Sequence, residues 1–399
     1  MSAPTRARGS GRTPSTPEGS APGRVTMVTA RCQPEIGGIE SHVAEVAARL
    51  ARRGWDLEVL TTDRSGELAR TERVAGYVVR RFRAFPARRD WYLAPGIFWS
   101  LLRHRRELVH VQGVHTLVPV VAMLACLLRR TPFVLTFHTG GSSSSFRHRA
   151  RGTQFRLLAP LLRRARVLVG VSDHERVLFD EVLGEPGRVR LVRNGGTLPV
   201  VAVPDSDAGD AQEPVLVSIG RLERYKGHHR VIEALPHLLP HHPDVRVEVL
   251  GSGPYEQDLL ALAEQLGVAD RVAIHFVPPP DRAAMARRLA RASVVCLISD
   301  YEAHPVAVME ALSLGRPVVV ARTSGLTELV ERGWAVGVEA DAAPRVVAEA
   351  LLAQLEDPVG PDPSELPTWE TCVDGLEEVY AETLPSPRAR AVLDVREPA

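Results

Sequence analysis

The sequence predicts an α/β protein built from two doubly wound, Rossmann-like domains in tandem. Short apolar segments rich in Val, Ile and Leu alternate with segments whose apolar residues recur at helical spacing. This alternation stops in a Pro- and Asp-rich stretch, residues 199–213, and restarts directly after it. Alternating strands and helices are typical of a parallel sheet covered on both faces, and a break between two such series indicates two domains.

The first domain is expected at residues 24–198, behind an N-terminal tail of residues 1–23 that is rich in Pro, Ser, Gly and Arg. Its expected helices include residues 39–54, where the apolar spacing ends at a glycine, and residues 117–130. Its expected strands are residues 24–30, 56–62, 108–113, 133–138 and 166–172.

The second domain is expected at residues 214–365, after a linker of residues 199–213. Its expected strands are residues 214–220, 245–251, 271–276, 293–299 and 317–321, and its expected helices are residues 228–239, 255–267, 281–292 and 305–315. The last segment, residues 366–399, contains a helix at 369–384 that can lie across either domain. Two such domains bind ligands at the carboxyl ends of their strands, so we expect a crevice in which these edges face each other.

Composition and charge indicate a globular protein of the cytoplasm. Hydrophobic residues make up 45% of the chain and charged residues 24%, and no apolar run reaches the roughly 18 residues of a membrane span. The N-terminus has basic residues but no apolar signal segment. Residues 213–399 carry 17 basic and 29 acidic side chains, which leaves 32 basic and 19 acidic for residues 1–212. Either the two halves dock through complementary charge, or the first half meets an anionic partner.

Cysteine and histidine spacing predicts neither a disulfide framework nor a metal site. The four cysteines lie far apart and form no C-x-x-C, so we expect reduced thiols. Pro240 interrupts any helix that would align the histidines around it, and no H-E-x-x-H occurs. The histidines concerned are His228, His229, His237, His241 and His242.

The stretch "GRLERYKGHH" contains Lys226, the only lysine in the chain, whereas the other 48 of the 49 basic residues are arginine. Arg221 and Lys226 fall on a loop between a strand and a helix, at the carboxyl edge of the second sheet. Such a loop combines two fixed positive charges with a helix N-terminus, and this combination suits a phosphate group. The alternative is two surface cations near a helix start, where cations are mildly unfavourable.

Two glutamates and a helix start form a second candidate site in "SDYEAHPVAVMEALSLG". Glu302 follows an apolar strand, Pro305 is expected to begin a helix, and Glu310 lies among apolar residues of that helix. A carboxylate in so apolar a helix either points to water or has a buried partner.

Gly37, Gly38 and His138 are candidates because of their place in the first sheet. The two glycines stand between the first strand and the first helix, where backbone N–H groups can approach an anion. The stretch lacks G-x-G-x-x-G, so a nicotinamide dinucleotide site is not supported. His138 stands at the carboxyl end of a strand, and it is either a ligand-binding or a structural histidine.

Together these stretches resemble the retaining GT-B glycosyltransferases of the family 4-like group, which includes glycogen synthases, sucrose synthases and bacterial mannosyltransferases. The resemblance covers residues 24–384, and its most specific motifs are R-x4-K and E-x7-E. It implies that the first domain binds the acceptor and the second binds a nucleotide-sugar donor. Gly37 and Gly38 would close on the diphosphate, and His138 would lie over the donor sugar.

The same resemblance implies a role for each residue of the second domain's motifs. Arg221 and Lys226 would hold the diphosphate, together with the helix start at Pro305, Val306 and Ala307. Glu302 would contact hydroxyls of the transferred sugar, and Glu310 would bind the ribose. The sequence departs from the common family pattern at residues 303–306 and in "FVPPPD", which leaves the nucleobase open.

The expected function is transfer of a sugar, with retention, from a UDP-sugar or GDP-sugar to an acceptor hydroxyl, without a metal or a cofactor. Two alternatives are a non-catalytic nucleotide- or sugar-binding protein and a nucleotide-sugar epimerase on the same fold. The expected acceptor is a small molecule or a lipid, which can be anionic, and no nucleic acid is expected. Residues Arg147–Arg166 contain seven arginines and no acid, so this helix can lie on an anionic membrane or be a solvated face.

Overall fold

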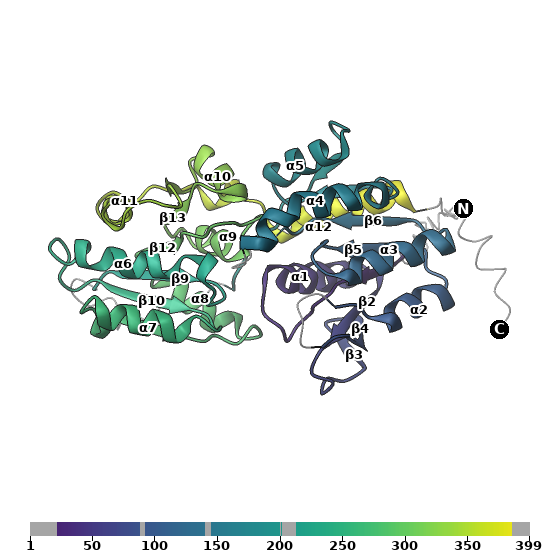
Figure 1. Ribbon diagram of the computed structural model, residues 1–399, viewed down its shortest axis with the longest axis horizontal. Coiled ribbons are helices and arrows are strands. Elements are labelled where there is room, and N and C mark those ends of the chain that lie inside the picture. The colour runs from purple at the N-terminus through teal and green to yellow at the C-terminus, as the bar shows by residue number, and fades with distance from the viewer. Residues whose placement is uncertain (1–21, 88–91, 140–144, 200, 202–212, 385–399) are drawn as a thin grey trace, which may run out of the picture.

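A computed structural model describes residues 22–87, 92–139, 145–199, 201 and 213–384, with the side chains of residues 145–151 excepted. The expected N-terminal tail, most of the linker and the C-terminal tail lie outside these residues. The described chain forms two α/β domains side by side (Figure 1), and this confirms the predicted fold class.

The N-terminal domain is built on an eight-stranded sheet with the order β3-β4-β2-β1-β5-β6-β7-β8. Neighbouring strands are parallel, except that β3 runs antiparallel to β4. The strands are β1 (Arg24–Val28), β2 (Asp56–Asp63), β3 (Thr71–Val74), β4 (Tyr77–Arg83), β5 (Leu108–Gln112), β6 (Phe133–Thr136), β7 (Leu168–Gly170) and β8 (Val189–Leu191).

Helices cover both faces of this sheet. One face packs against α2 (Pro95–Arg103), α3 (Leu117–Arg129), α4 (Ser145–Leu162) and α5 (Asp173–Leu183), whose buried residues share one hydrophobic cluster. The other face packs against α1 (Gly38–Arg52) and α12 (Trp369–Thr383) in a second cluster. Strands buried on both faces explain the near-continuous apolar runs in the sequence.

The C-terminal domain is built on a six-stranded parallel sheet with the order β11-β10-β9-β12-β13-β14. This is the doubly wound order whose direction reverses between β9 and β12, where ligands typically bind. The strands are β9 (Val215–Ile219), β10 (Arg246–Leu250), β11 (Val272–His275), β12 (Val294–Leu297), β13 (Val318–Ala321) and β14 (Val336–Val338).

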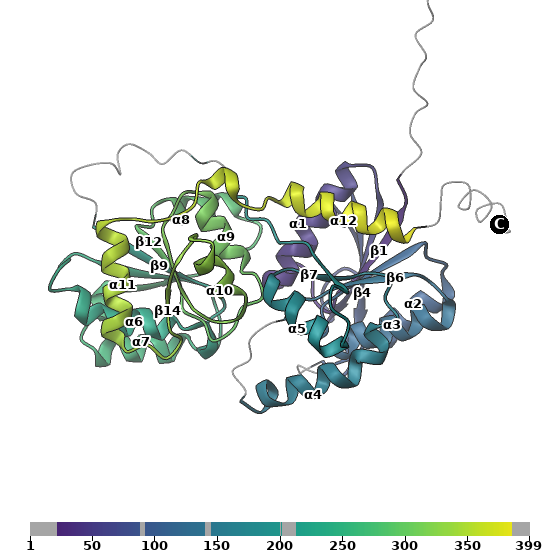
Figure 2. The same ribbon diagram turned by 90° about the horizontal axis from the view of Figure 1, so that it is seen from above.

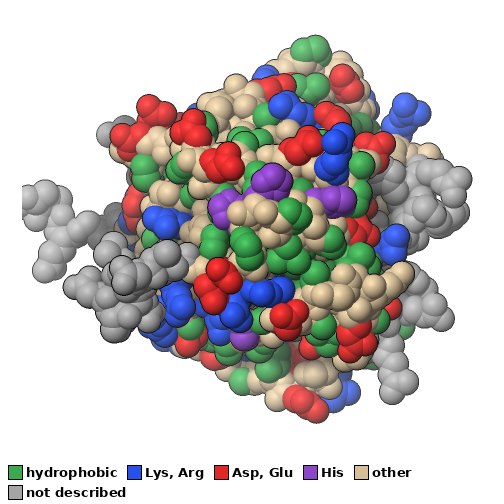
Figure 3. Space-filling model, turned by 90° about the vertical axis from the view of Figure 1, so that its left-hand side faces the viewer, with side chains coloured by type: hydrophobic (Ala, Val, Ile, Leu, Met, Phe, Trp, Pro, Cys, Tyr) green, Lys and Arg blue, Asp and Glu red, His purple; other side chains and the backbone are tan. Residues whose placement is uncertain are grey.

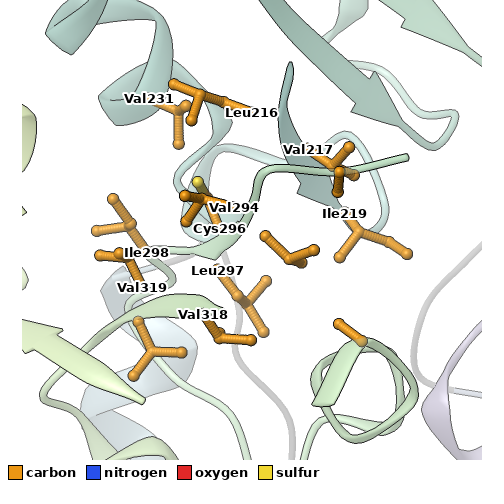
Figure 4. Packing of buried hydrophobic residues seen from close by; sticks show 14 of the residues in the cluster. Leu216, Val217, Ile219, Val231, Val294, Cys296, Leu297, Ile298, Val318 and Val319 are labelled. Atoms are coloured by element: carbon orange, nitrogen blue, oxygen red, sulfur yellow. The ribbon is translucent and has the colours of Figure 1, made fainter. Parts of the chain in front are cut away.

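The helices of this domain enclose a large apolar core, and Figure 4 shows part of it around β9, β12 and β13. Every residue of β12 and β13 is buried, and most of them are valines, which fit a pleated sheet covered on both faces. The helices are α6 (His228–Leu238), α7 (Glu256–Gln265), α8 (Arg282–Ala290), α9 (Val306–Ser313), α10 (Ser324–Glu331) and α11 (Pro344–Glu356).

The last helix returns from the second domain to the first. Helix α12 lies along α1 (Figure 2), where Trp369 and Tyr380 are fully buried. Its acidic face meets arginines of the first domain: Arg53 pairs with Glu370, Asp374 and Glu377 at 2.6 to 2.7 Å. The opposite charges of the two halves of the chain therefore meet along this helix.

All four cysteines are free and buried. Burial raises the pKa of the Cys32 thiol to about 11, so this thiol is protonated at neutral pH. Within the described residues, no helix combines the length and the apolar character that crossing a bilayer requires.

Candidate active site

A cavity of about 570 Å³ lies between the two domains, and both contribute to its walls. The loops that line it include those after β1 and β5 in the first domain and after β9 and β12 in the second, which are the strands where the order of each sheet reverses. Every site residue predicted from the sequence lines this cavity: Gly37, Gly38, His138, Arg221, Lys226, Glu302, Pro305, Val306, Ala307 and Glu310.

The loop after β9 carries Arg221 and Lys226 to the cavity. A short 3₁₀ turn, Arg224–Lys226, precedes α6, as the sequence predicted for a loop ending in a helix. Gly227 joins the two in a left-handed conformation, with φ 73°, and a Cβ there would lie 1.8 Å from the carbonyl oxygen of Ile298. Only glycine fits this junction without strain. His228 holds this loop by a hydrogen bond, since its Nε2 is 3.1 Å from the carbonyl oxygen of Arg221.

Lys226 and Glu302 form an ion pair inside the cavity, with 2.5 Å between Nζ and Oε1. Their side chains are 16% and 12% exposed. Burial by itself would lower the pKa of Lys226, but the negative charge of Glu302 more than compensates and raises it above the ordinary lysine value. The sequence assigned these residues to different groups of the donor, and it did not predict that they would contact each other.

The loop of Glu302 is held by the start of α10. The backbone N–H of Glu302 donates to Ser324 Oγ at 2.8 Å, and that hydroxyl donates to the carbonyl oxygen of Glu302 at 2.7 Å. A Cβ at Gly325 would lie 1.6 Å from the carbonyl oxygen of Ala303, so the two segments touch backbone to backbone. Sequence reasoning singled out neither Ser324 nor Gly325.

Glu310 has a buried partner rather than a solvated face. Its carboxylate is 4% exposed and pairs with Arg282, the first residue of α8. Burial raises the pKa of Glu310, while the positive charge of Arg282 opposes this shift. Because Arg282 also lines the cavity, the pair forms one polar corner of it. Arg282 is a site residue that the sequence did not reveal.

The two glycines after β1 have different surroundings, crowded at Gly37 and open at Gly38. A Cβ at Gly37 would lie 2.3 Å from Glu40 Oε2, so the carboxylate of Glu40 folds back over this loop. A Cβ at Gly38 would meet nothing within 4 Å, which leaves open space next to the cavity. Glu40 is 6% exposed, and burial raises its pKa. It is a second cavity residue that sequence reasoning missed.

His138 enters the cavity from the first domain. Its Nε2 is 2.8 Å from Oε1 of Gln112, at the end of β5. Burial lowers the pKa of His138 well below its ordinary value, and the nearby His42 contributes, so the ring is neutral at pH 7. The next residue, Thr139, donates its backbone N–H and its hydroxyl to the buried carboxylate of Glu175 at 2.6 and 2.7 Å.

The start of α9 also faces the cavity. Pro305 precedes the helix and lines the cavity with Val306 and Ala307. No side chain of the described residues caps this helix end. The first N–H groups of a helix lack intrahelical acceptors, and they favour a negatively charged group nearby.

The histidine-rich segment does not line this cavity. His228 uses both ring nitrogens within the protein, since its Nδ1 is 2.7 Å from Ser218 Oγ. Histidine side chains gather on the end of the C-terminal domain that lies on the left in Figure 1 (Figure 3). Across the part of the chain that the structure describes, no group of three or more His, Cys, Asp or Glu side chains is placed to hold a metal ion.

Comparisons with known proteins identify the family of the chain. The family model "Glycosyltransferase Family 4" matches residues 36–196, and the model "Glycosyl transferases group 1" matches residues 205–366. The D-inositol 3-phosphate glycosyltransferase of Nocardiopsis dassonvillei is 27% identical over 90% of this chain and 95% of that protein. The glycogen synthase of Mycobacterium tuberculosis is 27% identical over 92% of this chain and 97% of that protein.

Solved structures share the fold. The sucrose-phosphate synthase of Thermosynechococcus elongatus superposes with a TM-score of 0.72 and 20% identity, covering 90% of this chain and 98% of that one. Anabaena HepE in complex with UDP and glucose gives a TM-score of 0.71, also at 20% identity, over 90% of this chain and 99% of that one.

The fold and the residues of the cavity define a GT-B glycosyltransferase. The chain belongs to the family 4-like group of these enzymes, because a family 4 model matches its first domain and a glycosyltransferase group 1 model matches its second. The resemblance expected from the R-x4-K and E-x7-E motifs is thereby confirmed.

Proposed function

We propose that this glycosyltransferase moves a sugar from a nucleotide diphosphosugar to an acceptor hydroxyl, with retention at the anomeric carbon. The observation that carries the proposal is the convergence of Arg221, Lys226, Glu302 and Glu310 from the second domain with His138 from the first in one cavity. UDP is the preferred nucleotide, and this choice is supported by the UDP in the HepE complex, a protein of the same fold.

The positive charges that line the cavity suit a reaction in which negative charge develops on a diphosphate. When the bond between the anomeric carbon and the diphosphate oxygen breaks, its electron pair stays with the diphosphate. Arg221, Lys226 and the start of α9 all line the space where that charge would develop. Preorganised groups of this kind are typically worth about 3 kcal/mol each in the transition state. They supply the positive charge from the protein itself, so we propose that transfer needs no metal ion.

The test is incubation of the protein with UDP-, GDP- and ADP-sugars, followed by NMR of the anomeric protons. Transfer or slow hydrolysis with an α-configured product from an α-linked donor supports the proposal. A changed sugar on an intact diphosphate would show an epimerase instead. Calorimetric binding without any chemical change would show a non-catalytic binding protein.

For the acceptor, we propose an amphiphilic molecule presented at an anionic membrane surface. Four leucines of α3 lie on one stripe of the helix and are exposed, among them Leu124 at 44% and Leu128 at 69%. Exposed arginines, Arg129 and Arg130, stand at its end, and Arg156 on α4 and Arg164 just after that helix are also exposed. Thr116 and Pro119 at the start of α3 line the cavity, so this surface leads into the site. The side chains of Arg147, Arg149 and Arg151 lie outside the described residues.

Sedimentation with liposomes tests the membrane part. The wild-type protein is expected to bind vesicles of anionic lipid and not vesicles of neutral lipid, and Leu124→Glu with Leu128→Glu should abolish this binding. Leu260→Glu is the matched control, because Leu260 is an exposed leucine on α7 of the other domain. No binding by the wild type would indicate a soluble acceptor.

A further inference from the structure

Asn194 is the only asparagine in the chain, and it lies where the backbone leaves the first domain after β8. Its side chain is buried and hydrogen-bonded to both domains. Oδ1 is 2.8 Å from Nδ1 of His42 on α1, and Nδ2 donates to the carbonyl oxygen of His304 at 3.2 Å. A carbonyl oxygen only accepts hydrogen bonds, so this contact fixes which way the amide points. Nδ1 of His42 must then carry the proton.

Each end of this bridge leads to a residue of the cavity. The ring of His42 lies edge-on against the ring of His138, with 4.6 Å between their centroids. His304 stands two residues after Glu302, in the loop before α9. One buried amide therefore connects the wall that carries His138 with the wall that carries Glu302.

A second hydrogen bond joins the same two walls through Tyr301, the residue that precedes Glu302. The hydroxyl of Tyr301 donates to Thr139 Oγ1 at 2.8 Å. Thr139 is anchored in turn by Glu175, which is fully buried in the first domain. The residues that flank Glu302 are thus tied to elements next to His138 on both sides.

The backbone next to Asn194 is tightly packed against other segments. A Cβ at Gly195 would lie 2.1 Å from the backbone nitrogen of Trp369, and a Cβ at Gly196 would lie 2.2 Å from the carbonyl carbon of Met309. The chain therefore passes between α12 and α9 without room to shift. A longer side chain would displace it, and an aspartate would have no N–H to offer His304.

We propose that Asn194 is a positioning residue that holds the loop of Glu302 and the ring of His138 in one arrangement across the cavity. The kinetic part of this inference rests on the proposed function. A misplacement of about 1 Å in such an arrangement can reduce turnover by about 100-fold. Binding of the free nucleotide should change little, because Arg221 pairs with Glu223 and Glu310 pairs with Arg282, and neither contact involves the loop of Glu302.

Kinetics of matched variants test the role in turnover. Asn194→Asp should lower kcat by about 100-fold, with little change in the affinity for UDP. His42→Asn keeps a donor at the place of Nδ1 and should retain much more activity than His42→Gln, whose donor lies at the place of Nε2. Equal activities of the two His42 variants, or a fully active Asn194→Asp, would overturn the proposal.

Gln354→Glu is the control for a purely structural loss. Gln354 on α11 is also a buried amide that bonds to the backbone, and it does not line the cavity. Its Oε1 accepts from the N–H of Val359 at 2.7 Å, and its Nε2 donates to the carbonyl oxygens of Val359 at 3.0 Å and Val318 at 3.4 Å. This variant should lower the unfolding temperature but leave kcat unchanged. A comparable fall in kcat would show that any buried amide has this effect, and the assignment of Asn194 would then be wrong.

A measurement without turnover tests the bridge itself. Labelling the protein with ¹⁵N-asparagine gives side-chain amide signals from Asn194 alone, since no other asparagine exists in the chain. The two protons should exchange slowly with water, and both should shift in His42→Gln. A rapidly exchanging amide in the wild type would refute the bridge. If the bridge is present but no nucleotide sugar is turned over, the proposed function fails and the geometry of Asn194 stands.

Discussion

Lys226 and Glu302 form an ion pair in the cavity, with Nζ and Oε1 2.5 Å apart. A donor diphosphate would compete with Glu302 for the ammonium group, and the carboxylate would then become available to hydroxyls of the sugar. The pair therefore links binding of the diphosphate to the availability of Glu302. Both partners are more than four-fifths buried, so solvent screens this contact only weakly.

Glu302→Gln is expected to separate binding from turnover. The variant removes the carboxylate that competes for Lys226, so the affinity for free UDP should be at least that of the wild type. Turnover of UDP-sugars should fall by about 100-fold, if one transition-state contact is lost. Calorimetry and a UDP-release assay measure the two effects. A clear loss of UDP affinity would contradict the assignment of Glu302 to the sugar.

Glu310→Gln should show the opposite behaviour. This residue is assigned to the ribose, so the affinity for free nucleotide should fall by roughly 10-fold, as expected for one charged hydrogen bond. The variant also removes the charge that pairs with Arg282, whose side chain is 30% exposed, and the unfolding temperature should fall. The same titrations with Glu302→Gln provide the comparison. Equal losses of affinity in both variants would remove the distinction between the two glutamates.

Much of the architecture could be predicted from the sequence because it depends on local patterns. The apolar runs of β9, β12 and β13 and the helical spacing of α1 identified two parallel sheets and the order of their loops. Residues at the carboxyl ends of β6, β9 and β12 were expected at the facing edges of the two sheets, and His138, Arg221 and Glu302 all line the cavity there. The edge strand β3 was missed because its four residues are largely exposed and carry no apolar pattern.

The contacts across the cavity could not be predicted in the same way. Arg282 and Glu310 lie 28 positions apart, and Asn194 and His304 lie 110 positions apart. No local spacing marks such pairs, because they depend on how segments far apart in the chain pack together, within the second domain for Arg282 and Glu310 and between the two domains for Asn194 and His304. The only sequence feature that marks these contacts is the rarity of two residues. Lys226 is the single lysine and Asn194 the single asparagine of the chain, and both connect separate segments of the site.

Lys226→Arg is expected not to be conservative. The ammonium of Lys226 reaches Glu302 in an enclosed space, and a planar guanidinium has a different shape and a wider set of donors. We expect turnover to fall by about 10-fold or more, against about 100-fold for Lys226→Ala. Circular dichroism checks that both variants fold. Near-complete activity of Lys226→Arg would show that the single lysine reflects chance.

Stability should decrease in mild acid because several buried histidines are neutral in the folded protein. Burial lowers the pKa of His304 to about 3, with Arg193 and Arg332 nearby, whereas the unfolded chain binds the proton near pH 6.5. The stabilising contribution is therefore complete above about pH 6.5 and is lost as the pH falls towards 3.

His304→Phe tests this, because the variant has no proton to bind at that position. Neither ring nitrogen of His304 has a hydrogen-bond partner among the described residues, so phenylalanine should be tolerated. Relative to the variant, the wild type should lose about 2 kcal/mol of unfolding free energy between pH 7.5 and pH 5. Urea unfolding at both pH values measures the difference. If the unfolding free energy of both proteins fell by the same amount, the pKa of His304 would not be lowered in the folded protein.

The most direct test of the account compares UDP with uridine as ligands of the wild type, Arg221→Ala and Lys226→Ala. The central claim is that these two side chains hold a diphosphate in the cavity between the domains. Calorimetry should show that each variant binds UDP at least 10-fold more weakly than the wild type, since each loses one charged contact. Uridine, which has no phosphate, should bind all three proteins equally. If UDP binds the variants as tightly as the wild type, or if uridine binding falls to the same extent, Arg221 and Lys226 do not hold the diphosphate.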